Sequence, residues 1–185
     1  MVLKQSNMLP LGTKAPDFVL PDTVSGKSIA LEDVKSDIAT VIMFLCNHCP
    51  YVIHANQEIV RLANDYISRG ISFIAISSND PIKYPQDGPD KMAIVAKALQ
   101  YPFPYLFDES QNIAKDYDAA CTPDFYVFDR DLSLVYRGQL DDSRPGNDKI
   151  PSGSDLRQAI NAVINNKPVN PTQRPSIGCN IKWKV

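Results

Sequence analysis

TVIMFLCNHCPYV, residues 40–52, joins an apolar run to two cysteines in C-x-x-C spacing. Residues 40–45 are rich in strand-forming side chains, which predicts a short buried strand. Residues 51–69 carry apolar side chains at helical spacing before a glycine, which predicts a helix. Cys46 and Cys49 therefore lie where a buried strand gives way to a helix, at the open edge of a sheet where active sites of α/β proteins gather.

The rest of the chain continues this alternation. Residues 71–78 and 103–108 predict further strands, and residues 90–99, 110–119 and 154–166 predict helices, the second of them opened by Ser110 as its cap. Residues 124–129 and 133–140 flank a turn at 129–131 and predict a β-hairpin. Strand–helix–strand units followed by a hairpin and a helix imply an α/β fold with a mixed sheet and helices on both faces.

The bulk properties are those of an ordinary globular protein. The chain has 185 residues, a net charge of -2 and 44% hydrophobic residues, which gives no sign of a nucleic-acid or membrane partner. No apolar run is long enough to cross a bilayer, and the first residues lack the apolar core of a signal peptide. We therefore expect a cytoplasmic protein.

The C-terminal segment differs from the rest. Residues 168–185 contain three prolines and have no helical period, but they end in an apolar cluster that includes Ile177, Ile181 and Trp183. A purely disordered tail would not keep such side chains. We expect a domain over residues 1–167 and a Pro-rich extension over 168–185 that packs on it.

The cysteine pair has three readings. A structural zinc site needs four ligands, but the sequence offers only His48 and His54 besides the distant Cys121 and Cys179. Two inert buried thiols are the second reading, since cysteine is often buried. The third is redox chemistry, which the position favours, because amides and the dipole at a helix N-terminus stabilise a thiolate.

Several motifs resemble one known family. Residues 12–34, GTKAPDFVLPDTVSGKSIALEDV, are similar to the amino-terminal hairpin of the alkyl-hydroperoxide-reductase/thiol-specific-antioxidant (redoxin) branch of the thioredoxin superfamily. C-x-x-C at a helix start and CTPDFYVFD at 121–129 follow in the order of that superfamily. The ending SIGCNIKWK, residues 176–184, resembles the peroxiredoxin-like group with a C-x-x-C motif. The resemblance spans about residues 12–166 and implies a thioredoxin-like fold with a redoxin hairpin and a docked tail.

The resemblance also implies roles for site residues. Pro123 would be a cis-proline facing the cysteine pair, with the Thr122 backbone pairing with a substrate strand. Asn47-His48 between the cysteines looks more like the dipeptide of bacterial disulfide-forming oxidases than that of thioredoxins. We therefore expect an exposed, low-pKa Cys46 as nucleophile, a buried Cys49 that resolves the mixed disulfide, and a redox potential above that of thioredoxin. His48 would tune Cys46 or simply face solvent.

These features predict a thiol–disulfide oxidoreductase. The alternative is a peroxidase with Cys49 as the peroxidatic residue, but Cys46 and Ile42 would then stand where peroxiredoxins have threonine and proline. A copper- or zinc-binding module of the same fold is a third reading. We expect no cofactor and no resident metal. The expected partners are protein disulfides or peroxide, with a thioredoxin or glutathione system as the electron donor.

Six other positions also lead to expectations. Cys121 precedes the Thr-Pro turn and Cys179 lies in the docked tail, so each is either an additional redox residue or a packed thiol. Asp141 and Asp142 lack a third ligand and predict a solvated turn. Asp108 and Glu109 precede a predicted helix and are expected to stabilise its N-terminus.

Overall fold

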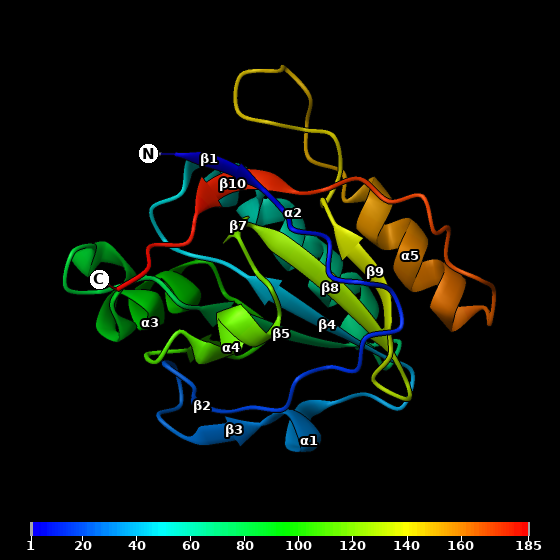
Figure 1. The fold of residues 1–185 in the computed structure, drawn as a ribbon, viewed down its shortest axis with the longest axis horizontal. Coiled ribbons are helices and arrows are strands. Elements are labelled where there is room, and N and C mark those ends of the chain that lie inside the picture. The colour runs from blue at the N-terminus through cyan, green and yellow to red at the C-terminus, as the bar shows by residue number, and fades with distance from the viewer. Residues whose placement is uncertain (1, 185) are drawn as a thin grey trace.

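The centre of the computed structural model, which describes residues 2–184, is a five-stranded sheet (Figure 1). Its order is β6 (Tyr105–Phe107), β5 (Ser72–Ser77), β4 (Ala39–Phe44), β8 (Asp124–Asp129) and β9 (Leu134–Gly138). The central strand β4 is parallel to β5 and antiparallel to β8, and β8 forms a hairpin with β9. The predicted mixed sheet is confirmed.

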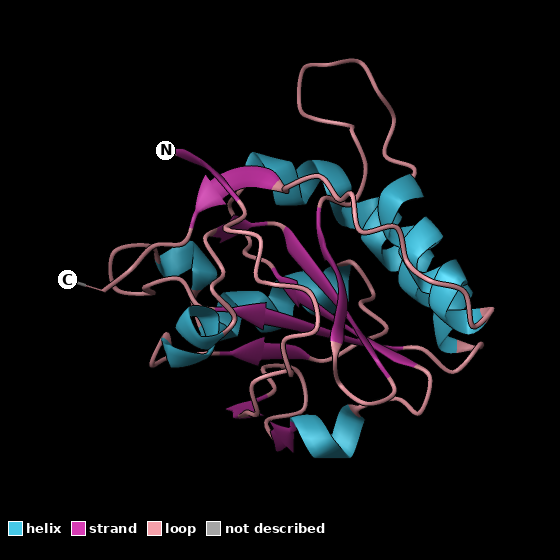
Figure 2. Ribbon diagram, turned by 45° about the vertical axis from the view of Figure 1, so that its right-hand side comes forward, coloured by secondary structure: helices cyan, strands magenta, loops and turns pink. Residues whose placement is uncertain are grey.

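Helices cover both faces of this sheet (Figure 2). One face packs against α2 (Pro50–Ile67), α3 (Pro89–Ala98) and α5 (Ser154–Ile164). The other packs against α4 (Asn112–Asp116) and the N-terminal unit, in which a hairpin of β2 (Val19–Pro21) and β3 (Ser28–Ala30) leads into α1 (Leu31–Val34). The redoxin-type hairpin is therefore present.

Strand β4 shows why the fold has two cores. Its side chains alternate between the two faces, as in any strand. Val41 and Met43 belong to the core under α2 and α5, whereas Ile42 and Phe44 belong to the core on the other face. All are buried, which is why this strand reads as a continuous apolar run in the sequence.

The two ends of the chain meet in a second sheet. It has the order β1 (Leu3–Gln5), β10 (Ile177–Asn180) and β7 (Cys121–Thr122), all antiparallel neighbours. The segment before β10 returns along α5 (Figures 1 and 2). Ile181 is fully buried, and its N–H donates to the Ala120 carbonyl. The predicted docking of the tail is confirmed.

The element predictions hold apart from shifts of a few residues at element ends, the largest at the helix predicted over 110–119, which is α4 over Asn112–Asp116. Its N-cap is Gln111, in a left-handed conformation, and not Ser110. The Ser110 Oγ still accepts from the Asn112 N–H at 3.2 Å, and the Asp108 Oδ2 accepts from the Ala114 N–H at 3.0 Å. Asp108 thus stabilises this helix start as predicted, and a short 3-10 turn over Pro85–Asp87 is an addition.

No described helix is long and apolar enough to span a membrane. The division at residue 167 and the cytoplasmic location stay predictions.

Candidate active site

The cysteine pair lies at the carboxyl end of β4. The strand ends at Phe44, Cys49 is the N-cap residue of α2, and Pro50 is its first residue. Proline is tolerated at this position because its missing N–H would have had no partner within the helix. The placement predicted from the sequence is confirmed.

The turn before β8 faces both thiols. The Thr122–Pro123 peptide bond is cis, as the resemblance implied. The Cys46 Sγ lies 3.2 Å from the Thr122 Oγ1. The Cys49 Sγ lies 3.2 Å from the Thr122 carbonyl oxygen, to which it donates when protonated. A dithiol and a cis-proline turn therefore form one site.

The chain's own tail occupies the backbone edge beside this turn. Cys179 in β10 pairs with Thr122 in antiparallel register. The approach is so close that a Cβ on Gly178 would lie 1.9 Å from the Thr122 carbonyl oxygen. The expectation that a substrate strand pairs with Thr122 is wrong for this structure, because β10 already holds that edge.

The two thiols are equally inaccessible. Cys46 is 1% exposed and Cys49 is 0% exposed, so the prediction of an exposed Cys46 is wrong. Contacts distant in the chain explain the difference: Thr122 and Asp87 lie beside Cys46, and β10 packs against α2.

Ionisation of the pair also differs from the prediction. The pKa of Cys49 is lowered to about 5, first because the Cys46 thiol donates a hydrogen bond to it, and further by donors from Cys179 and the Val52 N–H. The pKa of Cys46 is raised, first by that same hydrogen bond, then by burial and by the charge of Asp87. The shift of Cys46 is therefore opposite to the predicted low pKa, and the surroundings favour Cys49 as the thiol that ionises first.

Asp87, which the sequence did not single out, is the central acceptor beside Cys46. It is fully buried and accepts from the N–H groups of Asn47 and His48 and from the Asn79 side chain. The His48 Nδ1 lies 2.5 Å from its Oδ2, and the imidazole stacks on Tyr84. His48 therefore does not simply face solvent.

A signal for Asp87 was present in the sequence. The loop at residues 79–89 is longer than a connection needs, and it follows a strand next to β4 in the sheet. Parallel neighbours end at the same sheet edge, so this loop had to meet the cysteine pair. Periodicity cannot identify which of its side chains turns inward.

Cys46, His48 and Asp87 could also hold a metal ion. One ligand atom from each lies within 4.8 Å of the others. The His48 Nδ1 is hydrogen-bonded to Asp87, so an ion bound through that nitrogen would replace this bond. This set differs from the zinc ligands considered from the sequence, which were cysteines and histidines, because it uses one thiol of the pair and a carboxylate.

Replacing Asp87 with asparagine should make Cys46 more acidic, because the buried carboxylate opposes a thiolate there. We expect the pH profile of Cys46 alkylation by iodoacetamide to move down by about one unit. Mass spectrometry of the labelled peptides measures it, and Asp90→Asn, in the first turn of α3, is the control. An unchanged profile in Asp87→Asn would show that this carboxylate does not act on Cys46.

The remaining cysteines lie in different surroundings. Cys179 belongs to the same buried core as Cys49, and it helps to lower the pKa of Cys49. The Cys121 Sγ lies 3.9 Å from the Pro123 carbonyl oxygen and 4.0 Å from that of Ser176, and burial raises its pKa. A redox role for Cys121 stays a prediction.

A buried carboxyl follows the cis-proline and was also missed. Asp124 is 0% exposed, and its oxygens accept from the hydroxyls of Ser6 at 2.7 Å and Tyr126 at 3.1 Å. Burial raises its pKa to about 7. Ser6 also accepts from the Ser176 N–H, so Asp124 joins the two chain ends to the turn.

The other acidic pair is only partly as predicted. Asp142 is exposed and pairs with Lys149, as in a solvated turn. Asp141 is buried and accepts from the N–H groups of Ser143, Ser152 and Gly153. Burial alone would raise its pKa, but these hydrogen bonds outweigh it and lower the pKa.

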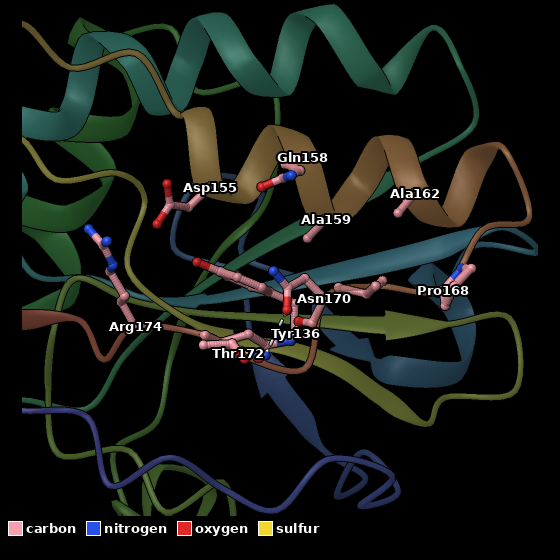
Figure 3. A pocket seen from close by; sticks show the side chains of 11 residues that line it. Tyr136, Asp155, Gln158, Ala159, Ala162, Pro168, Asn170, Thr172 and Arg174 are labelled. Carbon is pink, nitrogen blue, oxygen red and sulfur yellow. Dashed lines mark hydrogen bonds between the residues drawn. The ribbon is translucent and has the colours of Figure 1, made fainter.

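A cavity of about 520 Å³ lies elsewhere, between α5, β9 and the returning tail (Figure 3). Its lining contains no residue of the cysteine site; it consists of Tyr136, Asp155, Gln158, Ala159, Ala162, Pro168, Val169, Asn170, Thr172, Gln173 and Arg174.

Two solved structures resemble the whole chain. A conserved protein from Geobacillus kaustophilus, described as uncharacterized, is 60% identical, with a TM-score of 0.98 over 100% of this chain and 97% of that one. A hypothetical protein from Sinorhizobium meliloti 1021 is 48% identical, with a TM-score of 0.95 over 98% of each chain.

A more distant structure shares the fold. Peroxidoxin BcpB from Mycobacterium tuberculosis is 19% identical, with a TM-score of 0.63 over 84% of this chain and 96% of that one. A comparison with curated proteins finds no match. Residues 11–137 match the AhpC/TSA family, which is more than half of the chain. The chain therefore belongs to the AhpC/TSA family and has a thioredoxin-like fold.

Proposed function

We propose that this protein is a thiol–disulfide oxidoreductase that cycles between the Cys46–Cys49 dithiol and its disulfide. The observation that carries the proposal is the contact of both thiols with one cis-proline turn, each 3.2 Å from Thr122. Membership of a thiol-dependent redox family supports it.

The ionisation of the pair suggests the order of events. The Cys49 thiolate attacks one sulfur of a substrate disulfide, and the second substrate sulfur leaves as a thiolate. Cys46 then attacks the Cys49 sulfur of the mixed disulfide and gives up its proton. The substrate leaves with two added electrons, and the protein holds the Cys46–Cys49 disulfide until a thioredoxin or glutathione system reduces it. Access to Cys49 requires movement of the covering segments.

The test is reduction of insulin disulfides by the wild type and by Cys46→Ser and Cys49→Ser variants, with dithiothreitol as the electron source. Cys49→Ser should lose at least about a hundredfold in turnover, because it removes the attacking thiolate, and Cys46→Ser should lose the part of the turnover that depends on closing the Cys46–Cys49 disulfide. Cys121→Ala is the matched control. Full turnover in both single variants would refute the proposal.

Peroxide reduction is the second candidate, and the ionised Cys49 favours it. A small oxidant reaches a buried thiolate more easily than a protein does, and attack would give a Cys49 sulfenic acid that a second thiol resolves. Ile42 packs in the core on the opposite face of the sheet, so it cannot shield Cys49 as the proline of peroxiredoxins would. Stopped-flow reduction of hydrogen peroxide separates the two: if only Cys49 is essential, and only for peroxide turnover, the protein is a peroxidase.

Metal analysis of the same samples tests the third candidate function, metal binding. Stoichiometric zinc or copper that is lost in Cys46→Ser would favour a binding module built on Cys46, His48 and Asp87.

A further inference from the structure

Cys49 lies between two thiols. Cys46 lies in the loop that precedes α2, and Cys179 lies in β10, opposite the Thr122 whose carbonyl oxygen is 3.2 Å from the Cys49 Sγ. All three side chains belong to the same buried core and have 1% exposure or less. This buried core can therefore form a second disulfide, Cys49–Cys179, as well as the Cys46–Cys49 disulfide.

The position of Cys179 is fixed from two sides. It pairs with Thr122 of β7 and with Leu3 of β1, so it lies in the middle strand of the small sheet. Thr122 itself contacts both Cys46 and Cys49. The absent side chain of Gly178 allows this approach, because any Cβ there would overlap the Thr122 carbonyl. Cys179 thus lies directly opposite the residue that contacts both thiols of the pair.

The charges around Cys179 change with the redox state of Cys49. Burial, the hydrogen bond to Cys49 and the charge of Cys49 together raise the pKa of Cys179 to about 12, whereas Lys182 lowers it. When Cys49 enters a disulfide, it no longer carries a charge that opposes ionisation of Cys179. The positive charge of Lys182 remains, with its Nζ donating to the Asn180 carbonyl at 2.6 Å. Oxidation of the pair therefore removes one of the charges that oppose ionisation of Cys179.

We propose that Cys179 is a third redox cysteine, which takes over the disulfide from the active pair. In this step the Cys179 sulfur attacks the Cys49 sulfur of the Cys46–Cys49 disulfide. The Cys49–Cys179 bond forms, the Cys46–Cys49 bond breaks, and the electron pair leaves on Cys46, which takes up the proton that Cys179 gives up. The oxidation level of the protein is unchanged. The inference rests on the proposed function, since it needs a pair that becomes oxidised.

The product would join α2 to the C-terminal strand. A Cys49–Cys179 disulfide closes a loop from the start of α2 to β10 and holds the tail against the site. It also returns Cys46 to the thiol state. The tail would then be both the cover of the site and its internal substrate.

The experiment is disulfide mapping in Cys46→Ala, which keeps three cysteines. The reduced variant is oxidised with one equivalent of diamide, alkylated, digested and analysed by mass spectrometry. We expect the loss of two of its three thiols and a peptide pair joined through Cys49 and Cys179. Cys46→Ala/Cys121→Ala should give the same bond, and Cys46→Ala/Cys179→Ala should give no intramolecular disulfide.

A Cys49–Cys121 bond, or only intermolecular bonds, in folded Cys46→Ala would overturn the inference. Circular dichroism checks folding, and mapping of the wild type provides a measurement that does not depend on the variant: it should contain a Cys49–Cys179 form alongside the Cys46–Cys49 form. A wild type that forms only Cys46–Cys49 refutes the relay and leaves the proposed function standing. A wild type that forms no Cys46–Cys49 bond and reduces no insulin refutes the proposed function instead.

Discussion

Gly178→Ala is expected to destabilise the protein by about 3 kcal/mol or more and to uncover the cysteine site. The added Cβ would lie 1.9 Å from the Thr122 carbonyl oxygen and 2.7 Å from its carbon, and both are backbone atoms that no side-chain rotation can move. Strand β10 must therefore separate from β7. Urea denaturation measures the lost free energy of unfolding, and alkylation of Cys49 and Cys179 under native conditions should become faster.

The matched control for this prediction is Gly146→Ala. Gly146 has a φ of +85° and no heavy atom within 4 Å of an added Cβ. Alanine at this position therefore costs only the backbone strain, about 1 kcal/mol. Equal stability of Gly178→Ala and wild type, with unchanged thiol protection, would mean that β10 does not pack on the Thr122–Pro123 turn.

The free energy of unfolding of Asp124→Asn, relative to that of the wild type, should increase as the pH rises from acid to alkaline. The folded protein raises the pKa of this buried carboxyl from 3.8 to about 7, so the folded state holds the proton more tightly than the unfolded chain. The resulting stabilisation is complete below about pH 4 and is lost as the pH rises through about 7. A shift of about three units corresponds to about 4 kcal/mol, and asparagine has no proton to lose.

The measurement is the difference in free energy of unfolding between Asp124→Asn and wild type, by urea denaturation from pH 5 to pH 9. The difference should move in favour of the variant as the pH rises. Asp131→Asn, in the exposed hairpin turn, reports what the same substitution does at the surface. A difference that is constant over this range would mean that Asp124 does not keep its proton in the folded protein.

The strands and helices around the cysteine pair were predictable because their signals are local. The apolar run before Cys46 and the helical spacing after Pro50 each depend on a few neighbouring residues. The start of α4 was not predictable in the same way. Ser110 was expected to be the cap residue, but Gln111 holds that position, and Asp108 and Ser110 each accept from one N–H of the first turn. This arrangement depends on the path of the loop.

The sequence by itself determined the mixed α/β fold, the place of Cys46 and Cys49 between strand and helix, and, through its resemblance to redoxins, the cis bond before Pro123. Only the tertiary structure decided which cysteine is the thiolate. That choice depends on Asp87 and Cys179, which lie 41 and 130 positions beyond Cys46 and Cys49 respectively in the chain. Hydrogen bonds and charges act through space over a few ångströms, so a pattern of neighbours along the chain does not contain them.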